Sequence, residues 1–233
     1  MYIYGKNVCK EKLLTTDKIN KAFISNKFND KEIMHLIKKN KVKYTLCDNK
    51  MLDSKIKGLH QGIILDIDEI KTYDLDIINN IDKKYPLIVM LDHLEDPHNF
   101  GAIIRTSEAL GVDAIIIPND RNVNITSTVV KTSVGAIENI KIIRVVNLVN
   151  TIKKLKDNGY WIVGTDMNGT DYTTIDYNMP ICLIIGNEGK GMSRLVKENC
   201  DFIAMIDMVG KVNSLNASVS CGIVLSEIVS KRN

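Results

Sequence analysis

The sequence predicts an α/β protein with a parallel β-sheet in its larger, C-terminal part. After Pro86, continuous apolar runs of strand length alternate with helical stretches, which is typical of a parallel sheet covered by helices on both faces. The charge also changes sharply near residue 66, which separates a basic N-terminal part from the rest. We therefore predict a small α/β domain over residues 1–68, a linker over 69–84 and a larger domain over 85–233. A chain of 233 residues is long enough for both cores.

The predicted N-terminal domain is strongly basic. Residues 1–65 contain 14 lysines, no arginine and six acidic residues, a net charge of +8, whereas residues 66–82 carry −5. Local patterns predict helices over 6–14 and 30–40 and strands over 21–24, 43–46 and 62–66. The charge suggests that the domain meets a polyanion, although a lysine-rich surface can also serve solubility alone.

The C-terminal domain has a regular strand–helix alternation. Strands are predicted over 87–91, 114–117, 142–146, 161–164, 181–185 and 202–206, and helices over 101–110, 127–137, 149–158, 193–199 and 215–231. This periodicity alone favours a Rossmann-type sheet. Because ligands of such sheets bind beyond the carboxyl ends of the strands, we expect the chemistry in the loops after Leu91, Gly164, Ile185 and Ile206.

Composition argues against several classes of protein. Five widely spaced cysteines without a Cys-x-x-Cys pair disfavour a disulfide framework or a zinc site and favour reduced thiols in the cytoplasm. No apolar run reaches the roughly 18 residues that span a bilayer. The N-terminus also lacks the pattern of a signal peptide. We therefore expect a cytoplasmic protein with no metal and no membrane partner.

The loop after the first C-terminal strand leads into a helix that carries Asn99 and Arg105. Free backbone N–H groups at a helix N-terminus can hold an anion or a hydroxyl. We predict Asn99 as the N-cap, a role that would explain this residue without any function. Arg105 is harder to explain structurally, because an unpaired arginine in an otherwise apolar helical stretch would be costly to bury.

Two further loops contain glycines or small polar residues. Gly186, Gly189 and Gly191 allow backbone to approach a ligand closely, with Glu188 between them, although a plain strand-to-helix turn explains them about as well. The loop is not a phosphate-binding fingerprint, because Arg194 takes the place of the third glycine. In the last loop we predict Ser214 as the N-cap of the final helix. Capping and tight packing account less well for Asn216, since asparagine is a poor helix-interior residue.

Together, three segments resemble the SpoU (TrmH-like) branch of the SPOUT RNA methyltransferases. Residues 99–106 (Asn-x-Gly-x-x-x-Arg-Thr) are similar to the first motif, residues 185–191 to the second and residues 214–218 to the third. Residues 4–8 and 58–63 are similar to the family's substrate-binding module, which is related to an RNA-binding ribosomal-protein fold. Asn187, where serine is more usual, is the main departure, and a backbone contact is expected there.

The resemblance implies more than the pattern of strands does. The C-terminal segment would form a deep trefoil knot, an exception to the rule that chains are not knotted, and two subunits would pack there as a homodimer. The reaction would move a methyl group from S-adenosylmethionine to a ribose 2′-hydroxyl in RNA, specifically a guanosine in the peptidyl-transferase region of 23S rRNA. The cofactor would contact Gly186, Ile206, Leu215, Thr165, Gly191 and Met208. The catalytic residues would be Arg105, Asn99, Glu188, Ser214 and Asn216.

Several alternatives stay open at this point. The family view gives Arg105 the proton, but a guanidinium normally stays protonated, so Arg105 could hold a phosphate while Glu188 or a water takes the proton. A tRNA ribose methyltransferase of the same family would share these motifs. A non-catalytic RNA-binding protein is disfavoured by the presence of all the motif residues. The missing phosphate fingerprint disfavours a nucleotide-dependent oxidoreductase.

Overall fold

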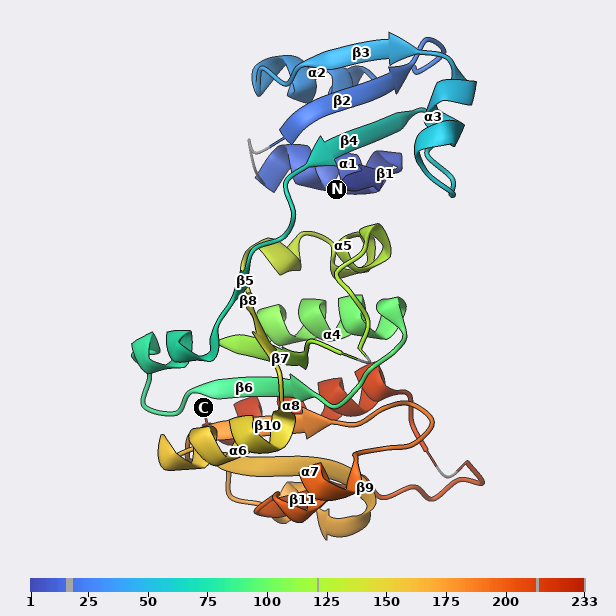
Figure 1. The fold of residues 1–233 in the computed structure, drawn as a ribbon. Helices are drawn as coiled ribbons and strands as arrows, with labels where there is room; N and C mark the ends of the chain where they lie inside the picture. The colour runs from blue at the N-terminus through green and yellow to red at the C-terminus, as the bar shows by residue number, and fades with distance from the viewer. Residues whose placement is uncertain (16–18, 121, 213, 233) are drawn as a thin grey trace. The chain divides into compact units, whose positions relative to one another are not determined.

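Residues 1–15, 19–120, 122–212 and 214–232 are described by the computed structural model (Figure 1). Contacts between residues divide the chain into two units. Unit 1 holds Met1–Ile70 and Ile125–Gly135, and unit 2 holds Lys71–Asn124 and Ala136–Asn233. Residues 125–135, which the strand–helix pattern assigns to the C-terminal domain, are grouped by their contacts with unit 1.

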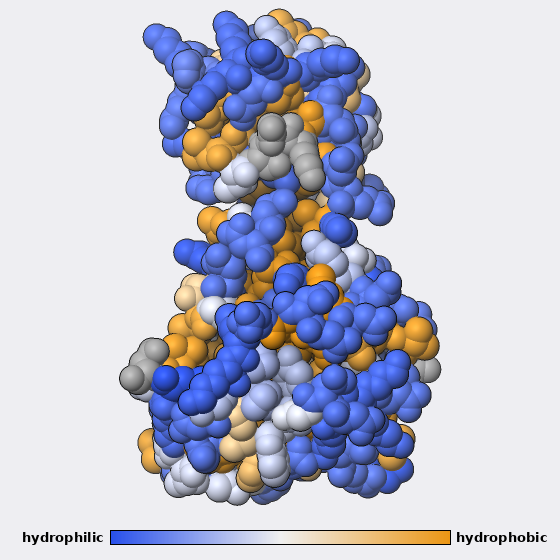
Figure 2. All heavy atoms as spheres, turned by 90° about the vertical axis from the view of Figure 1, so that its left-hand side faces the viewer, coloured by the Kyte–Doolittle hydropathy of each residue, from blue (hydrophilic) through white to orange (hydrophobic). Residues whose placement is uncertain are grey.

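Unit 1 contains a four-stranded sheet in the order β1-β4-β2-β3. Strand β4 is antiparallel to β1 and β2, and β2 is parallel to β3. Hydrophilic residues cover most of the face of this unit that is turned to the viewer in Figure 2, in its upper part. The predicted strands and helices are present, but the short strand β1 and helix α3 were not predicted. The elements are β1 (Tyr2–Tyr4), α1 (Lys6–Thr15), β2 (Ile19–Ser25), α2 (Lys31–Lys39), β3 (Tyr44–Cys47), α3 (Asn49–Lys55), β4 (Ile63–Ile67) and α5 (Ser127–Ser133).

Part of the predicted linker is folded into unit 2. Thr72–Tyr73 form β5, an edge strand parallel to β8, and Leu75–Asn80 form the 3-10 helix η1. Ile78 is 5% exposed and belongs to the hydrophobic core of this unit, with Ile77 and Ile81 packed against it. The acidic side chains of the segment lie outside that core. Residues 72–81 therefore do not form a free linker, because their apolar side chains pack against the core of unit 2.

Unit 2 contains a seven-stranded sheet in the order β11-β9-β10-β6-β7-β8-β5, in which every neighbouring pair is parallel. The predicted parallel sheet is therefore confirmed. Strand β9 continues well past its predicted end, and its pairing with β11 shifts at Ile203 and Ala204. The elements are β6 (Leu87–Leu91), α4 (Pro97–Ala109), β7 (Ala114–Pro118), η2 (Ala136–Glu138), β8 (Lys141–Val145), α6 (Leu148–Asp157), β9 (Trp161–Asp171), η3 (Tyr172–Thr174), β10 (Ile181–Ile185), α7 (Arg194–Glu198), β11 (Phe202–Met205) and α8 (Ala217–Arg232).

Helices cover both faces of this sheet. Apolar residues of α6 and α7, such as Ile152, Leu155 and Val196, share one core cluster with alternate residues of the central strands. Helices α4 and α8 contact each other on the other face (Figure 1). All residues of β6, β7 and β10 are buried, as two-sided burial requires. None of the described helices is long and apolar enough to cross a membrane.

The end of α8 is held by an arginine that binds backbone carbonyl groups. Arg232 donates hydrogen bonds to the carbonyl oxygens of Tyr85 (2.9 Å), Tyr177 (3.0 Å) and Met179 (2.7 Å). These carbonyls precede β6 and β10, so one guanidinium ties three segments of unit 2 together. Hydrogen bonds from a charged donor are stronger than neutral ones.

We expect Arg232→Met to lower the free energy of unfolding by about 2 kcal/mol, because it leaves three carbonyl groups without their charged donor. Chemical denaturation monitored by circular dichroism measures this value. The matched control is Arg194→Met, at an exposed arginine paired only with Glu198, which should cost less than about 0.5 kcal/mol. Equal losses in the two variants would contradict the role given to Arg232.

Candidate active site

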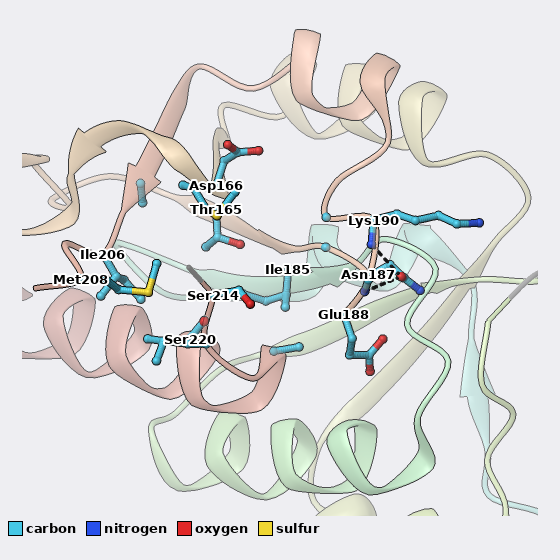
Figure 3. Close-up of a pocket in the computed structure, with 17 residues that line it drawn as sticks. Thr165, Asp166, Ile185, Asn187, Glu188, Lys190, Ile206, Met208, Ser214 and Ser220 are labelled. Carbon is cyan, nitrogen blue, oxygen red and sulfur yellow. Dashed lines mark hydrogen bonds between the residues drawn. The ribbon is translucent and has the colours of Figure 1, made fainter. Parts of the chain in front are cut away.

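A cavity of about 390 Å³ opens at the carboxyl side of the sheet in unit 2 (Figure 3). Its walls come from the middle of β9, the loop after β10, the segment after β11 and the start of α8. The pattern of strands predicts the functional residues in loops at strand ends. At β9 they lie instead within the strand, because Thr165 and Asp166 line the cavity and β9 continues to Asp171.

The loop after β10 folds back tightly on itself. Asn187 and Gly191 exchange two backbone hydrogen bonds of 3.0 and 2.9 Å. A Cβ atom on Gly186 would lie 2.4 Å from the carbonyl carbon of Gly191, so only glycine fits at this position. The loop therefore presents bare backbone to the cavity beside Gly186.

Asn187 holds this loop through its side chain. Its Oδ1 accepts hydrogen bonds from the backbone N–H groups of Gly189 (2.9 Å) and Lys190 (3.2 Å), and its Nδ2 donates to the carbonyl oxygen of His93 (2.8 Å). His93 has a left-handed backbone, with φ of 59°. The side chain of Asn187, at the position where the family usually has serine, thus anchors the loop to the segment just after β6. This side-chain contact was not predicted.

A chain of side-chain hydrogen bonds links Glu188 to α4 and α8. Asn99 Nδ2 donates to Glu188 Oε1 (2.9 Å), and Asn216 Nδ2 donates to Asn99 Oδ1 (2.9 Å). Asn216 Oδ1 in turn accepts from the backbone N–H of Ser218 (2.9 Å). Each amide therefore has only one possible orientation, and all donation runs towards the carboxylate of Glu188. In Figure 3 the Glu188 side chain points from the loop towards α4.

Two predicted helix caps were assigned to the wrong residue. The N-cap of α4 is Asp96, whose carboxylate accepts from His98 N–H, and Asn99 lies in the first turn with its side chain turned to Glu188. For α8 the capping side chain is that of Asn216, which directly precedes Ala217, rather than that of Ser214. Both errors have one cause, since a polar residue near a helix start can either cap the helix or bond elsewhere.

Arg105 lies outside this cavity. It is on the exposed side of α4 and is not among the residues that line the cavity. The expectation that Arg105 would be buried in an apolar stretch was therefore wrong, because the apolar residues around it, Ile103 and Ile104, turn to the core while its guanidinium faces solvent. Within the described ranges, no carboxylate pairs with it.

The other predicted residues cluster in the cavity. Glu188 and Ser214, which were predicted as catalytic, line it, whereas Asn99 and Asn216 reach it through Glu188. All six residues predicted to contact a cofactor lie in its walls, namely Thr165, Gly186, Gly191, Ile206, Met208 and Leu215.

Asp166 also lies in the cavity wall, and it was not predicted as a site residue. Burial alone would raise the pKa of Asp166, but hydrogen bonds from Lys197 Nζ and from the backbone N–H of Asn168 outweigh this effect and hold its pKa below the usual value. The cavity therefore has a carboxylate on the side of β9 that is paired with Lys197. A carboxylate two residues after the apolar strand-like run 161–164 was the available signal for it. Among the residues that the structure describes, no group of three potential metal ligands comes together.

Two family models match the chain. The model described as the SpoU rRNA Methylase family matches residues 86–226, and the model described as RNA 2′-O ribose methyltransferase substrate binding matches residues 2–73. Together they cover most of both units.

Curated relatives are similar along almost the whole chain. A Staphylococcus saprophyticus protein named as a TrmH family tRNA/rRNA methyltransferase is 45% identical over 238 residues, which cover 99% of this chain and 96% of that protein. A Bacillus subtilis protein with the same family name is 41% identical over 239 residues, which cover 100% and 96%.

A solved structure has a similar fold. The SpoU methyltransferase AviRb from Streptomyces viridochromogenes, in complex with AdoMet, matches with a TM-score of 0.81 at 22% identity and covers 100% of this chain and 90% of its own. The family match spans more than half of the chain, and the curated relatives exceed 40% identity over nearly all of it. The resemblance found in the three motifs is thereby confirmed, and the chain belongs to the SpoU rRNA methylase family of RNA methyltransferases.

Proposed function

We propose that this protein transfers a methyl group from S-adenosylmethionine to a ribose 2′-hydroxyl in RNA, specifically to a guanosine in the peptidyl-transferase region of 23S rRNA. One observation carries this proposal. In the wall of the unit 2 cavity, Glu188 lies beside the bare backbone at Gly186, and Asn99 and Asn216 orient its side chain. An RNA-modifying role of this kind also implies a cytoplasmic location.

The cavity fits S-adenosylmethionine in size and in chemistry. Its volume of about 390 Å³ lies in the usual range for small-molecule sites. Ile206, Met208 and Leu215 offer an apolar surface for an adenine ring, and Gly186 leaves backbone accessible to it. Asp166 would face the positively charged end of the molecule. When bound, this cofactor supplies a methyl group on a sulfonium cation.

We assign the proton of the ribose hydroxyl to Glu188, directly or through one water. Glu188 lines the cavity, and its carboxylate accepts a hydrogen bond from Asn99, which holds it in place as a proton acceptor. Arg105 is exposed to solvent, where its guanidinium can contact a phosphate of the RNA. Ser214 and the glycine loop would align the target hydroxyl.

We also propose that the functional form is a homodimer with a knotted C-terminal segment. Around the cavity, Val209, Val212 and Val219 are 100%, 67% and 49% exposed, an apolar surface that a second copy of the chain would cover. Helix α8 follows the edge strand β11 and yet packs against α4 and β10, so the chain crosses the sheet between them.

The 23S rRNA target is supported by the basic N-terminal domain, which matches a substrate-binding model. The second candidate is a tRNA ribose, because the curated relatives are named tRNA/rRNA methyltransferases. Incubation of total unmodified RNA with labelled S-adenosylmethionine, followed by mapping of the product, should give 2′-O-methylguanosine in 23S rRNA. A methylated tRNA would support the second candidate, and a methylated base would refute 2′-O transfer.

Replacement of the two candidate catalytic groups should separate their roles. We expect Glu188→Gln, which keeps an acceptor for Asn99, to lower kcat by about 100-fold or more with unchanged cofactor affinity. Arg105→Lys should raise KM for RNA while kcat stays within about threefold. Single-turnover methyl transfer measures both. A large loss of kcat in Arg105→Lys with normal RNA binding would instead give the proton to Arg105.

Disruption of the exposed apolar surface should yield a monomer. We expect Val212→Asp to shift the protein from dimer to monomer in analytical ultracentrifugation, because it places a charge in a buried interface. Leu195→Asp, at a leucine that is 51% exposed on α7 and away from this surface, is the control and should stay dimeric. A wild-type protein that sediments as a monomer at micromolar concentration would contradict the dimer.

A further inference from the structure

Unit 1 contains a cleft of its own, with a volume of about 400 Å³. Four segments that are distant in the sequence form it: the start of α1 at Lys6, the turn after β2, the first turn of α3 at Asn49, and the glycine-flanked turn before β4. Nothing in the methyl-transfer chemistry of unit 2 requires such a cleft. Its volume suits a nucleotide-sized ligand.

The walls of this cleft are held by specific hydrogen bonds. His60, which is 8% exposed, accepts from Gly62 N–H at Nδ1 (2.8 Å) and therefore donates to Asp53 from Nε2 (3.0 Å). Gln61 has a left-handed backbone with φ of 53°. Its side-chain oxygen accepts from Lys6 N–H (2.9 Å). The turn is thus fixed in a conformation that is unfavourable for an ordinary residue.

Hydrogen-bond donors dominate the polar groups of the cleft. Ser25 Oγ donates to Asn49 Oδ1 (2.7 Å), so the side-chain oxygen of Asn49 is engaged and its NH2 group points away from Ser25. The oxygen of Gln61 is engaged in the same way by Lys6 N–H, and its NH2 group points away from that bond. In the described part of the chain, neither NH2 group has a protein acceptor. Lys6 and Lys27 add two positive charges, although Asp30 lies 3.7 Å from Lys6 Nζ. The one carboxylate of the lining is that of Asp53.

Apolar surface completes the lining. Phe28 contributes its ring, with Lys6 Nζ 5.4 Å from the ring centroid, and Leu59 is 79% exposed at the rim. A ligand that suits this cleft has a flat apolar body, several acceptor atoms and a negative charge. An inorganic anion lacks the apolar body, and base-paired RNA keeps its bases inside the helix. An unpaired nucleotide has all three properties.

We propose that this cleft binds one unpaired nucleotide of the RNA substrate. The base packs against Phe28 and Leu59, the amide groups of Asn49 and Gln61 donate to its acceptors, and Lys27 contacts a phosphate. Asp53 can accept from a base N–H group. The inference rests on the proposed function for the identity of the polymer, and it adds where and in what form that polymer is recognised.

Two substitutions test the cleft with little risk to the fold. Asn49→Asp keeps the acceptor for Ser25 and replaces the NH2 donor with a negatively charged carboxylate oxygen, and Lys27→Glu changes an exposed side chain. Lys38→Glu is the matched control, because it makes the same charge change at an exposed position of α2 outside the cleft. Fluorescence anisotropy of full-length protein with a short labelled single-stranded RNA, and with its fully paired duplex, gives the affinities.

We expect both cleft variants to bind the single strand about 10-fold more weakly, with a small change for the duplex, and Lys38→Glu to affect both RNAs weakly and equally. Equal losses of RNA affinity in Lys27→Glu and Lys38→Glu, or equal affinity of the wild type for the single strand and the duplex, would overturn the proposal that the cleft binds an unpaired nucleotide. Calorimetric binding of S-adenosylmethionine, which the variants should retain, is the separate readout. A wild type that binds RNA through the cleft but not S-adenosylmethionine would refute the proposed function alone.

Discussion

The candidate site depends on one chain of hydrogen bonds, which runs from Asn216 through Asn99 to Glu188. These residues come from the start of α8, the first turn of α4 and the loop after β10, so the chain joins three elements that the sheet brings to one edge. Partly buried amides must satisfy both their donors and their acceptors, which leaves one arrangement. The loss of Asn99 would release both of its partners, and the effects of double substitutions at these positions should not be additive.

Much of the fold of unit 2 was predictable, because two-sided burial makes each strand a continuous apolar run, as in Ile181–Ile185. The grouping of Thr165, Gly186, Gly191, Ile206, Met208 and Leu215 in one cavity was predictable too, but through the family resemblance rather than through periodicity. Edge elements were harder, since β5 has only Thr72 and Tyr73 and is surrounded by acidic residues. The ion pair of Asp166 with Lys197 and the shifted pairing of β9 with β11 depend on tertiary contacts that no local pattern contains.

The environment of Arg105 differs from the one that its apolar neighbours in the sequence suggest. Those neighbours predict a guanidinium that is costly to bury, whereas the helix turns Arg105 to solvent. An exposed arginine retains its full hydration until a partner removes it, so its contribution to binding an RNA phosphate would be sensitive to salt. Glu188 has the opposite situation, because its partner belongs to the same chain and is already in place before any ligand arrives.

Helix α8 is anchored at both ends, by Asn216 to Asn99 and by Arg232 to the segments before β6 and β10. It also follows every other element in chain order. During synthesis on the ribosome, the other walls of the cavity are made first. Until α8 is made, Glu188 and Asn99 lack the hydrogen bond from Asn216. The site therefore assembles late, after α8 has left the exit tunnel, and a nascent chain cannot methylate RNA before then.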